Sequence, residues 1–536
     1  MFRSPLRAPR TAVLWTSLLL LGATPALAQE PSRTAASARP PESARPPESP
    51  WAYLTLMTGP LERVEASFAE LHVPLPRVLQ REHLERTFGF IGPGGLRGTG
   101  SLGMRMGAGE PGSTEASGHM IFPVHPDAAP LEAFTSRGAR PLPDSNDTVR
   151  IKGVFFRRPP GFLVLGPHTQ ADITGYDPQA DEDRLAAPGV LAEIDVDLAR
   201  WRKTDPSSFY RILTQNDGEK PAKEDHVSAL GRSMGTRIYE KLLDRVRLTF
   251  LDAGTGLRLR VELEPLAPGE ISPLPKPAFP RAAIGRVDIA YASAESSQWM
   301  QGVTEQFMNA AEKDNLFTDE RGTSVDVEQV REVLREAFTL FWSADALSIA
   351  VEPSKGKLLY HQVNQYRSPA GFTERVAALV EKLNALDRKP GQHKEGLELS
   401  TYGASGARVT RLTFPGSKFT VDFVESGTTV RIIAAEDSKR RLPALLKLPD
   451  DGTLSSSFSG MFDLNAAVDA YLSTGGHLPF PLQLRTREGL RGQLITWTTR
   501  AEGSAAVVDF DVPKPLARAL LQLQASRVHE ADASEP

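Results

Sequence analysis

A proline-rich stretch near the middle of the chain restricts the fold more than any other feature of the sequence. The segment EPLAPGEISPLPKPAFP, residues 264–280, contains six prolines and lacks the apolar periodicity of a helix or strand. Such a segment predicts a linker, which we place at residues 266–280. The chain then divides into two lobes, residues 51–265 and 281–525, each short enough to form a single domain.

The two predicted lobes repeat one order of elements, although few of their residues are identical. Each opens with a strand-like run, residues 51–57 and 284–292, which amphipathic helical stripes follow. In the second lobe we predict a hairpin at residues 346–363, and each lobe closes with a hairpin. Helices are predicted before and after that hairpin from two apolar stripes: Val327, Val330, Leu334, Phe338 and Phe341, then Phe372, Val376, Leu379 and Leu383. The sequence therefore predicts an α+β fold with two similar lobes of largely antiparallel sheet and packed helices, produced by an internal duplication.

Each lobe also contains an alternating run that carries acidic residues. The runs are LAEIDVDLARW, residues 191–201, and SGMFDLNAAVDAY, residues 459–471. Alternation of polar and apolar residues is typical of a half-buried strand, so we predict that both runs are strands.

The N-terminus has the pattern of an export signal. Three arginines precede an apolar run at residues 12–22, and the sequence Ala-Leu-Ala at residues 26–28 matches a small-x-small cleavage site. We therefore predict a signal peptide at residues 1–28, and the mature protein is expected in the periplasm or outside the cell. The high content of alanine, arginine, proline and glycine fits a bacterial source.

Two further segments are predicted to stay outside the folded lobes. Residues 29–50 contain the tandem repeat ARPPESARPPES, which has no apolar residue larger than alanine and predicts an extended tether. Residues 526–536 are predicted to be a disordered tail. No later apolar run approaches the roughly 20 residues of a spanning helix, so we expect a soluble mature chain with no transmembrane segment.

Composition excludes several classes of chemistry and partner. The chain has no cysteine, which excludes disulfides, a thiolate nucleophile and cysteine-ligated metal sites. Removal of residues 1–28, with their three arginines, changes the formal net charge from −4 to −7. An acidic chain is a poor candidate for nucleic-acid binding, which depends on a concentrated basic surface. The basic cluster at residues 150–158 is interpreted as a strand that ends in a turn.

The sequence GRSMG, residues 231–235, matches the G-x-S-x-G motif of serine hydrolases, with Ser233 as the nucleophile. The residues before it are mostly polar and do not form the buried strand that such a motif requires. An apolar stripe passes through the motif with helical spacing, so we interpret Ser233 as a helix residue. Its stripe residues are Val227, Leu230, Met234, Ile238 and Leu242.

Histidines and acidic residues give no strong metal-binding pattern. His119 and His125 are spaced to share a strand face, but no third ligand is near in the sequence. Asp177, Asp181 and Asp183 supply oxygen donors without the register of a calcium loop, and we interpret them as part of a solvated loop. We predict no metal site and no cofactor; the glycine-rich residues 92–103 also lack the lysine of a phosphate-binding loop.

Glu193, Asp195 and Asp197 alternate with aliphatic residues, so a strand would direct all three acids to one face. Two interpretations follow: a polar sheet face that points to solvent, which we favour, or carboxylates gathered in a cleft for acid–base chemistry.

The function that these observations favour is an exported soluble envelope protein with a non-catalytic binding or structural role. Its ligand or envelope partner is not identified by the sequence. The alternative is a secreted serine hydrolase that uses Ser233, with His361, His393 or His477 as its base.

Overall fold

The chain forms two compact units in the computed structural model, and each is described by itself. The N-terminal unit contains the described residues of 33–217, 239–265 and 509–536, and the central unit contains those of 266–508. The structure describes residues 52–108, 117–143, 145–167, 176–206, 240, 243–265, 274–277, 279, 283–290, 327–342, 344–354, 357–366, 371–386, 396–436, 438–454, 456–473 and 490–522.

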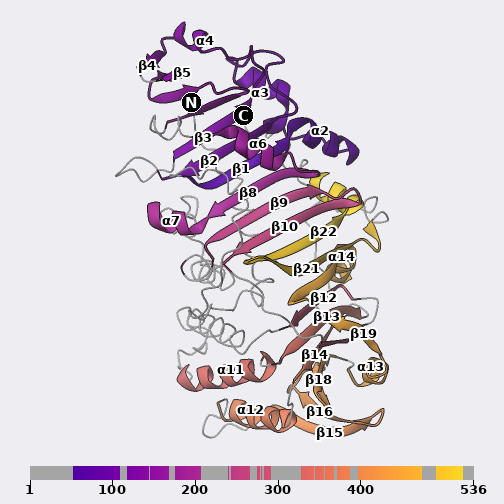
Figure 1. Ribbon diagram of the computed structural model, residues 1–536. Coiled ribbons are helices and arrows are strands. Elements are labelled where there is room, and N and C mark those ends of the chain that lie inside the picture. Colours follow the sequence, from indigo (N-terminus) through magenta and orange to yellow (C-terminus); the bar gives the residue numbers. More distant parts are fainter. Residues whose placement is uncertain are drawn as a thin grey trace. The chain divides into compact units, whose positions relative to one another are not determined.

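The N-terminal unit is built on an antiparallel sheet (Figure 1). Its strands are β1 (Ala52–Pro60), β2 (Ser101–Gly107), β3 (Ser117–Pro123), β4 (Arg140–Leu142), β5 (Ser145–Ile151), β6 (Val154–Arg157), β7 (Phe162–Gly166), β8 (Val190–Asp197), β9 (Arg245–Asp252) and β10 (Gly256–Glu264). They are ordered β4-β5-β6-β7-β3-β2-β1-β8-β9-β10 in the sheet.

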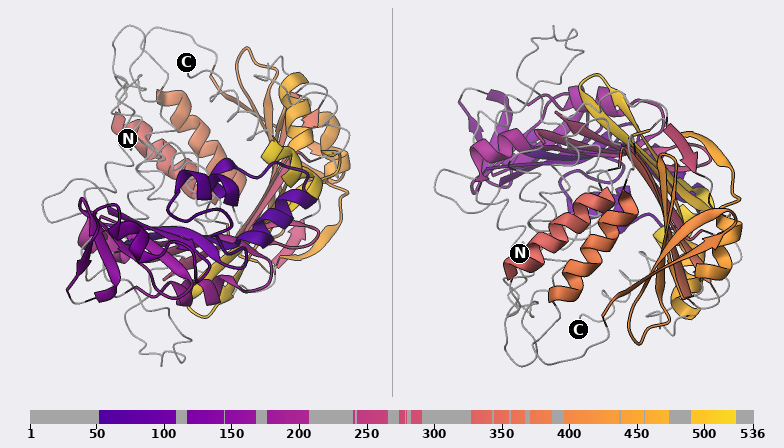
Figure 2. Two further views of the ribbon diagram at one scale, coloured as in Figure 1. Left: turned by 90° about the horizontal axis from the view of Figure 1, so that it is seen from above. Right: turned by 90° about the horizontal axis from the view of Figure 1, so that it is seen from below.

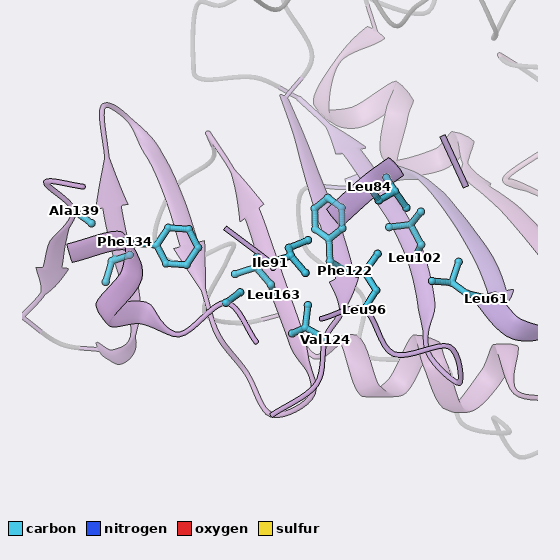
Figure 3. Packing of buried hydrophobic residues seen from close by; sticks show 12 residues of the cluster. Leu61, Leu84, Ile91, Leu96, Leu102, Phe122, Val124, Phe134, Ala139 and Leu163 are labelled. Carbon is cyan, nitrogen blue, oxygen red and sulfur yellow. The ribbon is translucent and has the colours of Figure 1, made fainter. Parts of the chain in front are cut away.

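Helices cover both faces of this sheet. They are α2 (Leu61–Glu70), the 3-10 helix η2 (Arg77–Leu79), α3 (Arg81–Thr87), α4 (Leu131–Thr135), α6 (Pro178–Leu185) and α7 (Leu198–Thr204). On one face, Leu84 of α3 and Phe134 of α4 join a core with Phe122 of β3 (Figure 3). On the other face, Leu185 of α6 packs with Ile121, the strand neighbour of Phe122. Because successive side chains of β3 point to opposite faces, this strand contributes residues to a core on each face of the sheet.

The central unit is also an antiparallel sheet. Its strands are β12 (Gly285–Ala290), β13 (Ala346–Ser354), β14 (Lys357–Gln365), β15 (Glu398–Ala404), β16 (Ala407–Thr413), β17 (Thr420–Ser426), β18 (Thr429–Ala435), β20 (Phe458–Asp463) and β21 (Leu494–Glu502). They are ordered β15-β16-β17-β18-β14-β13-β12-β20-β21. The residues of a further strand, β22 (Ala505–Pro513), are divided between the two units.

A separate two-stranded ribbon pairs β11 (Leu274–Pro277) with β19 (Asp450–Leu454) in the central unit. Strand β11 lies within the segment for which the sequence predicts a linker. The helices in the described residues of this unit include α11 (Val327–Trp342), α12 (Phe372–Leu386), α13 (Ser438–Leu445) and α14 (Leu464–Ser473).

The apolar stripes of α11 and α12 pack on one face of the central sheet. The two helices lie side by side in both views of Figure 2. Their residues Leu340, Phe372 and Val376 form a core with Phe423 of β17 and Ile432 of β18. The helical spacing of the apolar residues in both segments predicted these helices correctly.

The structure confirms the α+β class and the antiparallel sheets. The units also share an order of strands, because β4-β5-β6-β7-β3-β2-β1-β8-β9 corresponds to β15-β16-β17-β18-β14-β13-β12-β20-β21 along the chain. An internal duplication would produce this relation, and the duplication stays a prediction.

Both alternating acidic runs were predicted too long as strands. Strand β8 ends at Asp197 and β20 ends at Asp463, and each run continues as a helix. The reason is a helix cap in both cases, because Asp197 Oδ1 accepts the N–H of Arg200 and Asp463 Oδ1 accepts that of Ala466.

Candidate functional site

One face of the central sheet carries a row of polar and charged side chains. Strand pairing places Arg286 of β12 opposite Ala350 of β13, and Ala350 opposite His361 of β14. Directly paired residues in antiparallel strands share a face, so Asp288 and Ser348, which also pair, belong to the same side. These polar residues are buried, which sequence alternation alone does not predict.

Asp288 is the centre of a hydrogen-bonded cluster on this face. Its carboxylate accepts from Arg286 Nε at 2.8 Å and from Ser348 Oγ at 2.6 Å. Lys276 Nζ of β11 lies 3.4 Å from its other oxygen. A buried carboxylate requires such partners, and the ion pair fixes the β11–β19 ribbon to the sheet.

Phe279 covers the row of Arg286 and His361. Its ring centroid lies 4.7 Å from the Arg286 guanidinium carbon and 4.8 Å from the His361 ring centroid. Ala350 lies between these two residues in the register, and its small side chain leaves room for the phenyl ring. The proline-rich segment thus contributes an aromatic cap to the central unit.

His361 is fully buried below this cap, and neither ring nitrogen has a hydrogen-bond partner among the described residues. Burial, together with the charges of Arg431 and Arg286, lowers the pKa of His361 to about 3. A histidine with this pKa is a weak base, which makes it a poor partner for a serine nucleophile.

A cavity of about 610 Å³ lies next to this cluster, on the same face of the sheet. Its floor includes Ser348 of β13 and Arg431 of β18, and the ribbon contributes Pro275, Pro277 and Leu454. The turn between β15 and β16 forms a further wall, where Ser405 and Gly406 have φ of 49° and 82°. Two residues with positive φ are typical of the tight turns that join hairpin strands.

Three of the described residues that line the cavity are ionisable: Arg408, Glu425 and Arg431. Arg408 is exposed at the β15–β16 turn, and Arg431 is half-buried. Glu425 of β17 is on the opposite face of the sheet, which α12 covers, and its carboxylate accepts from Thr373 Oγ1 at 2.8 Å and from the Thr373 N–H at 3.4 Å. Alternation along β16 places Arg408 on the face of Glu425, so Arg431 is the ionisable residue of the described lining whose register position is on the cavity face.

Sequence reasoning missed this site. Arg431 stands within the apolar strand run VRIIAA, and a lone arginine in such a run is a signal of a functional or paired charge. Lys276 and Phe279 were assigned to a linker, and no local pattern indicates that they reach the sheet. His361 was predicted as a candidate base for a hydrolase, and the structure places it in this cluster.

In the N-terminal unit, Glu193 and Asp195 have exposed fractions of 6% and 8%, so our preferred interpretation of a solvent-facing acidic surface was wrong for them. Arg184 of α6 binds Glu193, and Arg245 of β9 binds Asp195, with Nε 2.7 Å from Oδ1. Burial raises the pKa of Asp195, but the hydrogen bond and charge of Arg245 outweigh it and lower the pKa overall. Both carboxylates are held in ion pairs, which indicates that they stabilise the sheet.

The three aspartates that we assigned to a solvated loop instead belong to α6 and its cap. Asp177 caps the helix by accepting the N–H of Gln179, and Pro178 occupies the first turn. Asp181 is buried and accepts from Tyr176 Oη at 2.7 Å, while Asp183 accepts from the Gln179 side chain. A helix forms because the cap and proline start it.

The other motifs also have internal contacts. His119 is buried in β3, whereas His125 lies beyond that strand, and the described residues contain no group of three potential metal ligands. The basic cluster forms β5 and β6, and Arg158 donates to backbone carbonyls. Ser233, His393 and His477 lie outside the described residues.

Comparison with protein-family models gave no match, and neither did searches of curated proteins or of solved structures. Within the part of the chain that the structure describes, no helix has the length and apolar composition needed to cross a membrane.

Proposed function

We propose that this protein is an exported envelope protein with a non-catalytic binding role, and that the cavity of the central unit is its ligand site. The observation that carries the proposal is a cavity of about 610 Å³ with several polar side chains in its lining. Small-molecule sites are commonly about 300–1,000 Å³ and place a few polar groups in a largely preformed cavity.

The ionisable groups at the cavity favour binding over catalysis. Arg431, whose register position is on the cavity face, is a poor acid and base, because a guanidinium keeps its proton at ordinary pH. His361 is covered by Phe279, and its pKa of about 3 makes it a weak base. Thr373 holds the Glu425 carboxylate at the start of α12.

A screen against small molecules tests the binding role. We expect at least one member of a panel of glucose, arginine, succinate, citrate and inorganic phosphate to raise the melting temperature of the whole protein. Ser426→Trp places a bulky ring at an exposed lining position and should abolish that shift. Ser400→Trp, at an exposed position on β15 outside the lining, is the matched control and should preserve it. A panel in which no member binds contradicts the proposal.

The periplasmic or extracellular location rests on the N-terminal pattern, which lies outside the described residues. Expression in a bacterial host and N-terminal sequencing of the exported protein test it, and we expect cleavage between Ala28 and Gln29. Recovery of an uncleaved chain from the cytoplasm contradicts this location.

The alternative, a secreted serine hydrolase, rests on the GRSMG sequence alone. An organophosphate probe tests it, since an activated serine reacts with the probe whereas an ordinary helix serine does not. We expect no labelling of the whole protein and no effect of Ser233→Ala on its melting temperature. Labelling that Ser233→Ala abolishes replaces the binding proposal with the hydrolase.

A further inference from the structure

We infer that residues 523–530, which directly follow the last described residue, dock as an amphipathic helix in a groove of the N-terminal unit between α2 and α3. The occupant of this groove is thus a segment of the same chain. The docking site lies in a different unit from the proposed ligand cavity, so it goes beyond the proposed function.

The groove has a volume of about 1050 Å³ and a partly apolar lining. Helices α2 and α3 and the loops beside them contribute its apolar residues: Phe68, Ala69, Val73, Leu75, Pro93 and Leu96. An apolar groove beside two helices is suited to bind the apolar face of a further amphipathic helix.

The charged residues of the lining leave this apolar surface to the occupant. Arg81 donates two hydrogen bonds of 2.7 Å to the carboxylate of Glu65, and Glu85 accepts two backbone N–H groups. The other ionisable residues of the lining are exposed to solvent: Glu82, Arg86 and His125. An occupant therefore needs an apolar face toward the groove and a polar face toward water.

The described chain ends beside this groove. Residues 514–522 form a helix after β22, and Leu521 lies in its last turn. Leu521 packs against the apolar cluster that contains Val73, and Phe68 packs against the same cluster. Because Val73 and Phe68 also line the groove, the residues that follow begin at its edge.

The apolar spacing of this helix continues beyond its described part. Lys514, Ala517 and Leu521 are spaced to share one helix face, and all three contact α2 or the cluster at its end. Ala525 and Val528 follow Leu521 at four and seven positions, so they extend the same face by about two turns. The opposite face of the extension is mostly polar: Ser526, Arg527 and Glu530.

This docking differs from the disordered tail that the sequence predicts for residues 526–536. A short segment by itself is only marginally helical in water. Here a folded helix precedes the segment, which removes the cost of starting a new helix, and the groove supplies an apolar surface for its stripe.

Distances between spin labels test the docking from the side of the segment, and a chain without cysteine carries no background label sites. Ala66→Cys lies at an exposed position of α2 outside the lining, and Ala531→Cys lies just beyond the docked residues. Pulsed electron paramagnetic resonance of the doubly labelled whole protein should give one narrow distance distribution. Val528→Asp places a charge in the apolar stripe and should widen this distribution about twofold or more. Ser526→Asp, on the opposite helix face, is the matched control and should leave it unchanged.

A second test changes the groove and leaves the segment intact. Trypsin cleaves after arginine, and cleavage after Arg527 requires that the segment first leave the groove. Leu75→Asp in the lining should therefore speed this cleavage about tenfold, as measured by mass spectrometry of the whole protein. Val78→Asp is the control, because Val78 is 68% exposed and lies outside the lining, and it should be cleaved like wild type. Circular dichroism shows whether Leu75→Asp folds, and the spin-label test decides if it does not.

Three results overturn the inference. A broad distance distribution that Val528→Asp does not change shows that the segment stays free. Equal rates of cleavage after Arg527 in wild type and in Leu75→Asp show that it does not bind this groove. A narrow distance that appears when the two singly labelled proteins are mixed, and that disappears on dilution of the doubly labelled protein with unlabelled protein, shows that a second copy supplies the occupant.

Discussion

The N-terminal and central units share one strand order, but different side chains occupy corresponding positions on the polar face of each sheet. In the N-terminal unit, Arg105 of β2 pairs across the sheet with His119 of β3. In the central unit, Ala350 of β13 occupies that place beside His361 of β14, and the arginine stands one strand away as Arg286. Both histidines are fully buried, so the two rows differ mainly in the position of an arginine.

This shift changes what covers each face. Tyr176, which precedes α6, lies over Arg105 with its ring centroid 4.3 Å from the guanidinium carbon. The ion pairs around it leave a cavity of only about 40 Å³. In the central unit, Phe279 from the distant proline-rich segment covers the place above Ala350, and a cavity of about 610 Å³ lies beside it. On this face of the sheet, one strand order thus supports a closed ionic layer in the N-terminal unit and a cavity in the central unit.

The largest expected effect concerns the ionic layer of the N-terminal unit. Asp195→Ala removes a buried carboxylate and leaves the mostly buried Arg245 side chain, 17% exposed, without it, which should lower the free energy of unfolding by about 3–5 kcal/mol. Urea unfolding followed by circular dichroism measures it. The control is Asp511→Ala, which removes a more exposed Arg–Asp pair with Arg258 and should cost at most about 1 kcal/mol. Equal effects of the two variants would show that the layer contributes no special stability.

The second prediction concerns acid sensitivity of the central unit. His361 has a folded pKa of about 3, whereas an unfolded histidine titrates near 6.5. Between these values the unfolded chain binds the proton and the folded chain does not, so stability falls as the pH falls. From pH 6 to pH 4 this histidine should remove about 2–3 kcal/mol from the free energy of unfolding.

His361→Phe should reduce the loss on acidification by that amount, as measured by urea unfolding at both pH values. His125→Phe replaces an exposed histidine and should leave the loss unchanged. If His361→Phe and wild type lose the same stability, His361 is not held neutral by the fold.

The sequence predicted the elements whose residues follow a clear period. The stripes of α11 and α12 and the hairpin of β13 and β14 were identified because each buries one regular face. The acidic runs were extended too far, since alternation continued past Asp197 and Asp463 while both side chains already capped helices. An aspartate at the end of an alternating run is the signal that could have corrected both boundaries.

The candidate site was not predictable from local pattern. Asp195 is buried because Arg245, 50 residues later in the chain, lies beside it, and Asp288 depends on Lys276 of a proline-rich segment. Such pairings are set by tertiary register, which the sequence of one strand does not contain. The cavity likewise depends on how the β11–β19 ribbon meets the sheet.

The third prediction tests the cap that distinguishes the central unit. Phe279→Ala should cost about 1–2 kcal/mol, less than a fully buried phenylalanine, because this side chain is only half-buried. It should also admit water to His361 and raise the pKa of that histidine from about 3 toward 6.5. Titration of the His361 ring protons by NMR measures this change. Phe419→Ala, at an exposed site of the same unit, is the control and should leave the His361 titration unchanged. If the pKa of His361 is unaltered in Phe279→Ala, residues other than Phe279 exclude water from the histidine ring.

The smallest expected effect tests whether the correspondence between the units extends to a single residue. Asp197 and Asp463 each end a strand and accept the N–H of the residue three positions later. Asp197→Ala and Asp463→Ala should therefore each lower the free energy of unfolding by about 1 kcal/mol, as measured by urea unfolding. Asparagine keeps the cap but removes the charge, and Asp197 also lies 3.6 Å from Arg200. Asp197→Asn should then lower the free energy of unfolding slightly more than Asp463→Asn. A large difference between the two alanine variants would show that the two caps do not contribute equally to stability, despite the shared strand order.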